Sequence, residues 1–141
     1  MDKNLEISND STLLNSVVGL IDQARNRVAT TVNQELTLLY WNIGKLINDN
    51  VLGNKRADYG KQILPTLSVQ LETQYGRNFT EKNVRRMMRF NDEFPDLNIL
   101  PPLAAKLSWS HFIELFSIKT EEARLFYANK AIQETWSKRA L

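Results

Sequence analysis

The sequence contains no cysteine, a single histidine, and only 5 glycines and 4 prolines among 141 residues. The lack of cysteine excludes a disulfide framework, a thiolate nucleophile and Cys-ligated zinc or iron–sulfur sites. No apolar run approaches the roughly 20 residues that span a bilayer. The N-terminus also lacks the basic and apolar regions of a signal peptide. We therefore expect a cytoplasmic protein that does not enter a membrane.

The charge is small overall but concentrated in one part of the chain. The net charge is +2, yet residues 51–91 hold eight Lys or Arg side chains against three Asp or Glu. Acidic residues outnumber basic ones on both sides of this segment. The rest of the composition, 43% hydrophobic and 24% charged, is typical of one packed domain. A short basic element on a nearly neutral domain is a candidate contact for phosphate groups.

The spacing of apolar residues predicts helices throughout, and no segment alternates as a strand does. Residues 1–11 have no apolar period and are expected to be a disordered tail, followed by a single helical domain over residues 12–141. Apolar steps of three and four predict a helix of about 40 residues from Ser11, its N-cap, to Asn50. Such a helix is longer than a small domain, so we expect a bend near residues 30–33, giving a helical hairpin, or packing on another chain.

Shorter helices are predicted in the rest of the chain, separated by turn residues. They are a helix from about Tyr59 or Lys61 to Tyr75, ended by Gly76, and three helices capped by Thr80, Ser108 and Thr120. Consecutive prolines predict a loop over residues 96–102. The aromatic residues expected in the core are Trp109, Phe112, Phe116, Phe126, Tyr127 and Trp136. Residues 136–141 look like the start of another helix, which suggests that the chain was cut from a longer protein.

The predicted fold class is all-α: a helical bundle with a long N-terminal helix or helical hairpin and a helix-turn-helix-like segment. In a helix-turn-helix the second helix enters the major groove, and here the helix after the glycine turn is basic. Four of its cations lie at i, i+3, i+4 and i+7, so they share one face. The candidate nucleic-acid-binding residues, all expected to be exposed, are Arg77, Lys82, Arg85, Arg86 and Arg89. A surface helix with a merely solvated basic face remains the alternative.

No catalytic residue, metal site, cofactor or small-molecule substrate is assigned from the sequence. His111 has no Gly-x-Ser-x-Gly elbow to work with and is interpreted as structural. A weaker alternative is a small hydrolase that uses His111 with an acidic partner. The acidic cluster of Asp92, Glu93 and Asp96 lacks the regular ligand spacing of a calcium loop. It is interpreted as a solvated helix end.

Several strings in order resemble the N-terminal domain of the YhcG-like family of bacterial proteins. They are Leu39-Tyr40-Trp41-Asn42-Ile43-Gly44, Tyr59-Gly60-Lys61, Phe79-Thr80 with Asn83-Val84 and Arg86-Met87, Leu107-Ser108-Trp109-Ser110-His111, and Glu122-Ala123-Arg124-Leu125-Phe126-Tyr127 leading to Trp136-Ser137. The resemblance covers about residues 12–141. Full-length members carry a PD-(D/E)xK-type nuclease domain after this helical one, but no such residue set occurs within this chain. The resemblance implies a DNA-associated or partner-binding module placed ahead of a nuclease.

Two functional hypotheses follow. The first is a non-catalytic module that binds DNA, or positions a nuclease on it, through the basic helix. The alternative is an oligomerisation or protein-interaction domain built on the long first helix, without direct nucleic-acid contact. In either case we expect a homo-oligomer through that helix, because it carries more apolar surface than one small domain covers.

Overall fold

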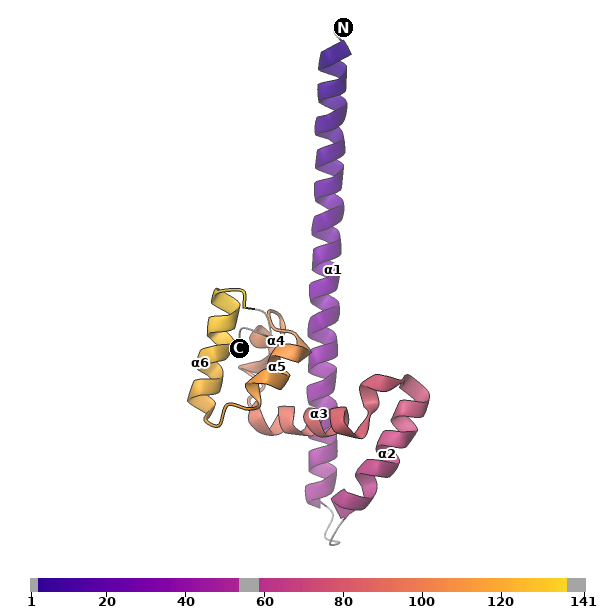
Figure 1. The fold of residues 1–141 in the computed structure, drawn as a ribbon, viewed down its shortest axis with the longest axis vertical. Coiled ribbons are helices and arrows are strands. Elements are labelled where there is room, and N and C mark those ends of the chain that lie inside the picture. Colours follow the sequence, from indigo (N-terminus) through magenta and orange to yellow (C-terminus); the bar gives the residue numbers. More distant parts are fainter. Residues whose placement is uncertain (1–2, 54–58, 137–141) are drawn as a thin grey trace. The chain divides into compact units, whose positions relative to one another are not determined.

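The computed structural model describes residues 3–53 and 59–136, which contain six α-helices, one 3-10 helix and no strand (Figure 1). The all-α fold with a long first helix is therefore as predicted. The helices are α1 (Lys3–Gly53), α2 (Tyr59–Tyr75), a 3-10 helix (Arg77–Phe79), α3 (Glu81–Glu93), α4 (Leu100–Ala104), α5 (Trp109–Leu115) and α6 (Glu121–Gln133). No helix among these residues is long and apolar enough to cross a bilayer.

Helix α1 is longer than predicted. It begins at Lys3 instead of Ser11, so the expected tail is helical over the part that the structure describes. Residues 3–10 contain neither glycine nor proline, and extending an existing helix is easy compared with nucleating one. Residues 30–33 are helical as well, so the predicted hairpin is not formed.

The contacts divide the chain into two compact units, residues 1–32 and residues 33–141. The first unit is a segment of α1 alone. No side chain of residues 11–32 is buried, and Leu13, Leu14 and Leu20 are each more than 60% exposed. The apolar face of this segment therefore has no partner within its own unit. A single helix without tertiary packing is of low stability in water.

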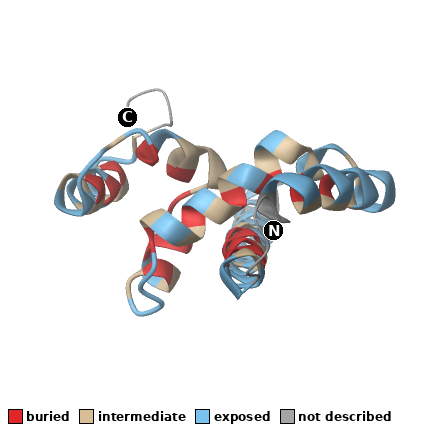
Figure 2. Ribbon diagram, turned by 90° about the horizontal axis from the view of Figure 1, so that it is seen from below, coloured by how far each residue is buried: buried red, intermediate tan, exposed pale blue. Residues whose placement is uncertain are grey.

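The second unit has an aromatic core built from α1, α3 and the helices that follow α3. Trp41 is 1% exposed, and its indole Nε1 donates a hydrogen bond to the carbonyl of Phe94 at 2.8 Å. The rings of Phe90 and Phe112 pack with their centroids 4.6 Å apart. The main buried cluster is Trp41, Phe90, Phe94, Leu100, Leu103, Leu107, Phe112, Leu115, Phe116, Ala128 and Ala131. In Figure 2 the helices of this unit carry buried positions on one side and exposed positions on the other.

Helix α3 crosses the C-terminal part of α1 at very short range (Figure 1). A Cβ atom added to Gly44 would overlap the backbone carbonyl of Met87, so only glycine permits this approach. Asn48 then donates hydrogen bonds from Nδ2 to the carbonyl of Met88 at 2.9 Å and to Oδ1 of Asn91 at 3.0 Å. This crossing fixes the position of α3, and it therefore also fixes the direction in which the opposite face of α3 points.

The turn between α2 and α3 forms as the sequence predicts. Gly76 has φ +97°, a left-handed conformation that favours glycine, and its N–H donates to the carbonyl of Glu72 at 2.8 Å. Thr80 caps α3, its hydroxyl accepting from the N–H of Asn83 at 3.3 Å. The pair of helices and their connecting turn make up the helix-turn-helix-like segment. Pro65 lies inside α2.

Two sequence expectations about the C-terminal helices are wrong. Pro101 and Pro102 do not lie in a loop but in the first turn of α4, where the missing proline N–H groups leave no helix bond unmade. Phe126 is 59% and Tyr127 41% exposed, whereas both were expected to lie in the core. The helix predicted to begin at residue 136 falls largely outside the described residues.

Candidate nucleic-acid interface

The five predicted cations belong to α3 and to the turn that precedes it. Val84, Met87 and Phe90 of α3 are fully buried. The cations fall on the other side of the helix, as the spacing predicts. Lys82, Arg85 and Arg89 are exposed and Arg86 is half-buried, while Arg77 is exposed in the 3-10 helix. The structure thus brings four of the five onto one face of α3.

Two of these arginines are already engaged within the chain. Arg85 forms an ion pair with Glu81 one turn earlier, with Nη2 and Oε1 2.8 Å apart. Arg89 donates from Nη2 to the carbonyl of Phe116, and its guanidinium carbon lies 5.8 Å from the centre of the Phe116 ring. Its Nε is also 3.6 Å from Glu93. Arg89 therefore attaches α3 to the end of α5, a structural role that the sequence spacing did not reveal.

The other three cations have no hydrogen-bond or ion-pair partner in the described part of the chain. They are Arg77, Lys82 and Arg86. Arg86 borders a hollow of about 250 Å³ with Ser110, Ile113 and Glu114 of α5. The carboxylate of Glu114 therefore belongs to the surroundings of this arginine and lowers the positive potential there. Arg77 and Lys82 lie nearer the turn, where α3 begins.

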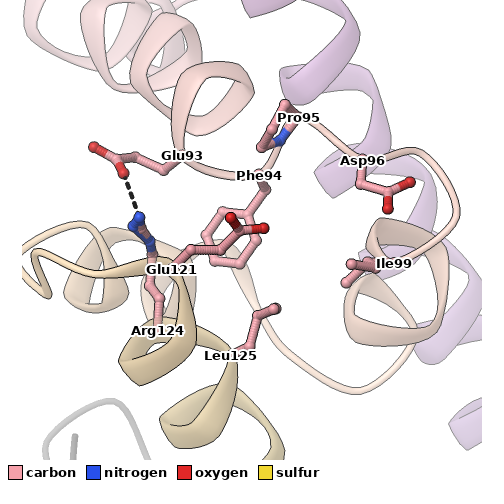
Figure 3. A pocket seen from close by; sticks show the side chains of 8 residues that line it. All are labelled: Glu93, Phe94, Pro95, Asp96, Ile99, Glu121, Arg124 and Leu125. Carbon is pink, nitrogen blue, oxygen red and sulfur yellow. Dashed lines mark ion pairs between the residues drawn. The ribbon is translucent and has the colours of Figure 1, made fainter.

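The far end of α3 is tied to α6 by a charge pair that sequence reasoning missed. Glu93 Oε2 lies 2.8 Å from Nη2 of Arg124, whose side chain is only 6% exposed (Figure 3). The Arg124 guanidinium also lies 5.9 Å from the ring centre of Phe94. Arg124 shares a face with Ala128 and Ala131, the other buried residues of α6. In the sequence, the spacing of Arg124 from these two small residues, at i+4 and i+7, was the signal that could have indicated a buried arginine.

The predicted acidic cluster does not converge on one point. Asp92 accepts a hydrogen bond from Asn48 at 3.2 Å, and Asp96 accepts one from the N–H of Asn98 at 2.8 Å. Figure 3 shows Asp96 turned away from the Glu93–Arg124 pair. Burial, and secondarily the charge of Glu93, raise the pKa of Asp92 above its ordinary value. Within residues 3–53 and 59–136, no three His, Asp or Glu side chains are grouped as a metal ion would require.

His111 is part of a helix cap. Its Nδ1 accepts from the N–H of Ser108 at 3.1 Å, while its own N–H donates to Ser108 Oγ at 3.4 Å. This is a capping box with histidine in the place usually taken by Glu or Gln. Since Nδ1 accepts, Nε2 carries the proton, and it donates to the carbonyl of Trp136 at 2.7 Å. Both ring nitrogens are occupied without a carboxylate, which favours the structural interpretation over the hydrolase alternative.

The strings that suggested a family have structural roles of this kind. Gly44 allows the helix crossing, Ser108 and His111 cap α5, and Arg124 joins α6 to α3. Of the predicted basic residues, the strings include Arg86 alone. Most of the family signal therefore marks the fold, and the basic face is to be tested separately.

Comparison with known proteins agrees with the resemblance. The profile described as the DUF1016 N-terminal domain matches residues 16–141. A protein of Escherichia coli (strain K12) named "Putative nuclease YhcG" is 31% identical over an alignment 155 residues long. The alignment covers 89% of this chain and 41% of that protein. The chain thus spans about two-fifths of the length of this relative. No solved structure matches the chain. With its profile match extending over most of the sequence, the chain belongs to the DUF1016 N-terminal domain family and is related to the nuclease-family protein YhcG.

Proposed function

We propose that this domain binds DNA through the exposed face at the start of α3 and the preceding turn, without cleaving it. The observation that carries the proposal is the group of three cations without an internal partner: Arg77, Lys82 and Arg86. Side chains of this type neutralise phosphates in a sequence-independent way. Arg85 contributes by exchanging Glu81 for a phosphate, since its ion pair is exposed and of little net stability.

The relationship to a named nuclease supports a DNA-linked role for the domain. The name belongs to a protein of which this chain matches 41%. In this proposal the chain itself binds DNA and does not cleave it. Arg89 is set aside from the interface because it is bound to Phe116 and Glu93. The proposed role is therefore targeting: the domain holds the duplex, and the chemistry takes place elsewhere in the full-length relatives.

The test is duplex binding measured by fluorescence anisotropy over a range of salt concentrations. Lys82→Ala/Arg86→Ala should weaken binding to unrelated sequences alike and reduce the slope of log affinity against log salt by about two units. The matched control is Lys106→Ala/Lys119→Ala, which removes two exposed cations away from α3. Equal effects of the two double variants, or no salt-dependent binding by the parent, would contradict the proposal.

A second candidate function is self-association, favoured by a different observation. In residues 11–32 every large apolar side chain is at least 43% exposed. Such a face is characteristic of a surface that another chain covers. Sedimentation at tens of micromolar should then show a dimer or larger species, and a monomer would remove this candidate.

A further inference from the structure

An open groove of about 520 Å³ lies in the second unit between α1 and α2. Leu39 of α1 and Leu71 of α2 are among the apolar side chains that line it. Tyr75 and Phe79 bring two aromatic rings to the groove, with their centroids 5.7 Å apart, and Tyr75 is 68% exposed. The volume lies within the range of small-ligand sites. The groove is therefore an apolar hollow with an accessible aromatic ring beside it.

Two polar groups of this groove have no hydrogen-bond partner in the part of the chain that the structure describes. One is the hydroxyl of Tyr40, a residue that lines the groove although it is only 6% exposed. Burial raises the pKa of this hydroxyl, so it stays protonated at neutral pH and is able to donate. The other is the side-chain amide of Asn78, which is exposed and both donates and accepts. Because buried polar groups without a partner are rare, the Tyr40 hydroxyl indicates a ligand that supplies one.

The groove adjoins the cations that we assign to DNA. Arg77 belongs to the same 3-10 helix as Phe79, and only Gly76 separates it from Tyr75 at the end of α2. Lys82 follows in the first turn of α3. None of the described residues that line the groove is charged. A ligand that fits both surfaces therefore carries negative charge at one end and an uncharged, flat group with polar edges at the other.

A nucleotide within a DNA strand has this combination of chemical groups. Its phosphate is anionic, and its base is a planar ring with hydrogen-bond donors and acceptors on its edges. Proteins that bind single strands stack the bases on aromatic side chains while cations follow the backbone. A base inside a duplex is paired and stacked on both sides, so only an unpaired base is free to enter. An apolar helix or an acyl chain in the groove would instead leave the Tyr40 hydroxyl without a partner.

We propose that the groove between α1 and α2 takes up an unpaired DNA base, which packs on the ring of Tyr75 and accepts a hydrogen bond from Tyr40. The phosphates next to this base bind Arg77 and Lys82. The proposal rests on the DNA-binding function proposed above and deepens it, because it names the substrate as DNA in which unpaired bases adjoin a duplex.

Fluorescence anisotropy with three DNA probes at one salt concentration tests the proposal. The probes are a blunt duplex, the same duplex with a short single-stranded extension, and the extended duplex with abasic sites throughout its extension. The protein should bind the extended probe at least about fivefold more tightly than the abasic one, as expected for one stacked base. The abasic probe keeps every phosphate, so equal affinity for these two probes would overturn the proposal.

Two variants identify the groove as the site of the base. Tyr75→Ala removes the exposed ring and should bring the affinity ratio of the extended and abasic probes close to one. Tyr40→Phe keeps the ring that packs 5.1 Å from Trp109 and removes only the hydroxyl, so the ratio should fall by at least about twofold. Tyr127→Ala is the matched control, since Tyr127 is 41% exposed on α6 and does not line the groove.

The control should keep the ratio of the parent, and an equal loss in Tyr127→Ala would contradict the assignment. Circular dichroism checks folding, and Tyr75→Leu replaces Tyr75→Ala if helix content falls. Tyr75→Phe retains an aromatic ring and should retain the ratio. Both groove variants should keep the salt slope of the parent, because they leave Arg77 and Lys82 in place.

The same measurements separate this proposal from the others. Absence of salt-dependent binding to any probe would contradict DNA binding itself, whereas salt-dependent binding that is equal for extended and abasic probes would overturn the groove alone. Displacement of the extended probe by micromolar dAMP would mean that the groove takes a free nucleotide instead of a base in a strand. If Tyr75→Ala changed the sedimentation of the DNA-free protein but not the ratio, another chain would be the occupant.

Discussion

At the scale of single residues, the absence of a side chain at Gly44 determines how closely α3 packs against α1. The backbones of α1 and α3 meet where Gly44 faces the carbonyl of Met87, and there is no room for a Cβ atom. The buried side of α3 begins at this point, with Val84 and Met87 both fully buried. Any side chain here separates the two helices and moves the basic face with α3.

Gly44→Ala should therefore destabilise the fold by about 1–3 kcal/mol, the usual cost of forcing extra atoms into a packed contact. Chemical denaturation followed by circular dichroism measures the change. Gly19→Ala is the matched control, since Gly19 lies in the same helix with nothing within 4 Å of an added Cβ. That control should gain about 0.5–1 kcal/mol from helix propensity alone. Equal behaviour of the two variants would show that the crossing tolerates a side chain.

Asp92 gives a prediction about pH. Partial desolvation, and secondarily the charge of Glu93, raise the pKa of its carboxyl, so the folded state holds the proton more tightly than the unfolded state does. Protonation of Asp92 thus stabilises the fold, and this contribution is lost as the pH rises through the raised pKa. Asp92→Asn keeps an oxygen that can accept from Asn48 and removes the charge. At pH 7 the variant should be slightly more stable than the parent, and the gain is small because Asp92 is largely exposed and solvent screens its charge.

Thermal melts of both proteins between pH 3 and pH 7 test this. The difference between Asp92→Asn and the parent should shrink as the pH falls, because the parent then becomes protonated at Asp92. A difference that grows toward acid pH would mean that the ionised carboxylate is the favoured form in the fold.

At the scale of elements, α3 is held at both ends and at its centre. Thr80 caps its start, Gly44 admits it against α1, and Glu93 binds Arg124 of α6. Arg89 adds a contact to the carbonyl of Phe116. An element attached in this way presents Lys82 and Arg86 in fixed positions, which lowers the entropic cost of binding an extended phosphate backbone.

Glu93→Ala should weaken the attachment of α3 to α6. It leaves the guanidinium of Arg124 buried without its carboxylate, which costs about 1–3 kcal/mol. Glu121→Ala is the control. Glu121 lines the pocket drawn in Figure 3 together with Glu93 and Arg124, but it is exposed in the first turn of α6, where a carboxylate contributes at most about 1 kcal/mol. Denaturant unfolding compares the two variants. If Glu121→Ala lowered the free energy of unfolding more than Glu93→Ala does, the ion pair between Glu93 and Arg124 would not be what attaches α3 to α6.

The starts of α3, α5 and α6 were predictable because each is encoded locally. Thr80, Ser108 and Thr120 each accept from an N–H three residues later, as the cap pattern predicts. The prolines of α4 were misread because the same residues that end a helix also begin one. Phe126 was placed in the core by residue type, although its face of α6 is exposed.

The candidate site was predicted only in part, for a similar reason. Spacing places four cations on one face of α3, but it does not reveal which of them bind other parts of the chain. Arg89 reaches Phe116, which is 27 residues away, and Arg124 reaches Glu93 across the core. Contacts of this kind depend on how the helices pack, and no local pattern encodes that packing.

At the scale of the whole molecule, two surfaces have separate proposed roles. The cations Arg77, Lys82 and Arg86 are assigned to DNA, and the exposed apolar side chains of residues 11–32 are the candidate contact with a second copy. Two chains in one dimer would offer two basic faces to one duplex. Because each phosphate contact adds to the salt dependence, such a dimer binds with a steeper salt slope than one chain.

The most direct test of the central claim is an NMR titration of the isotope-labelled chain with a short duplex, which reports the contact residue by residue. The account predicts that the largest amide shifts occur in the 3-10 helix and the first two turns of α3, around Arg77, Lys82 and Arg86, and that they fade as salt is raised. The amides of α6 and of Leu71 in α2 should shift little. Shifts centred outside the α3 face, or none at any salt concentration, would contradict the account.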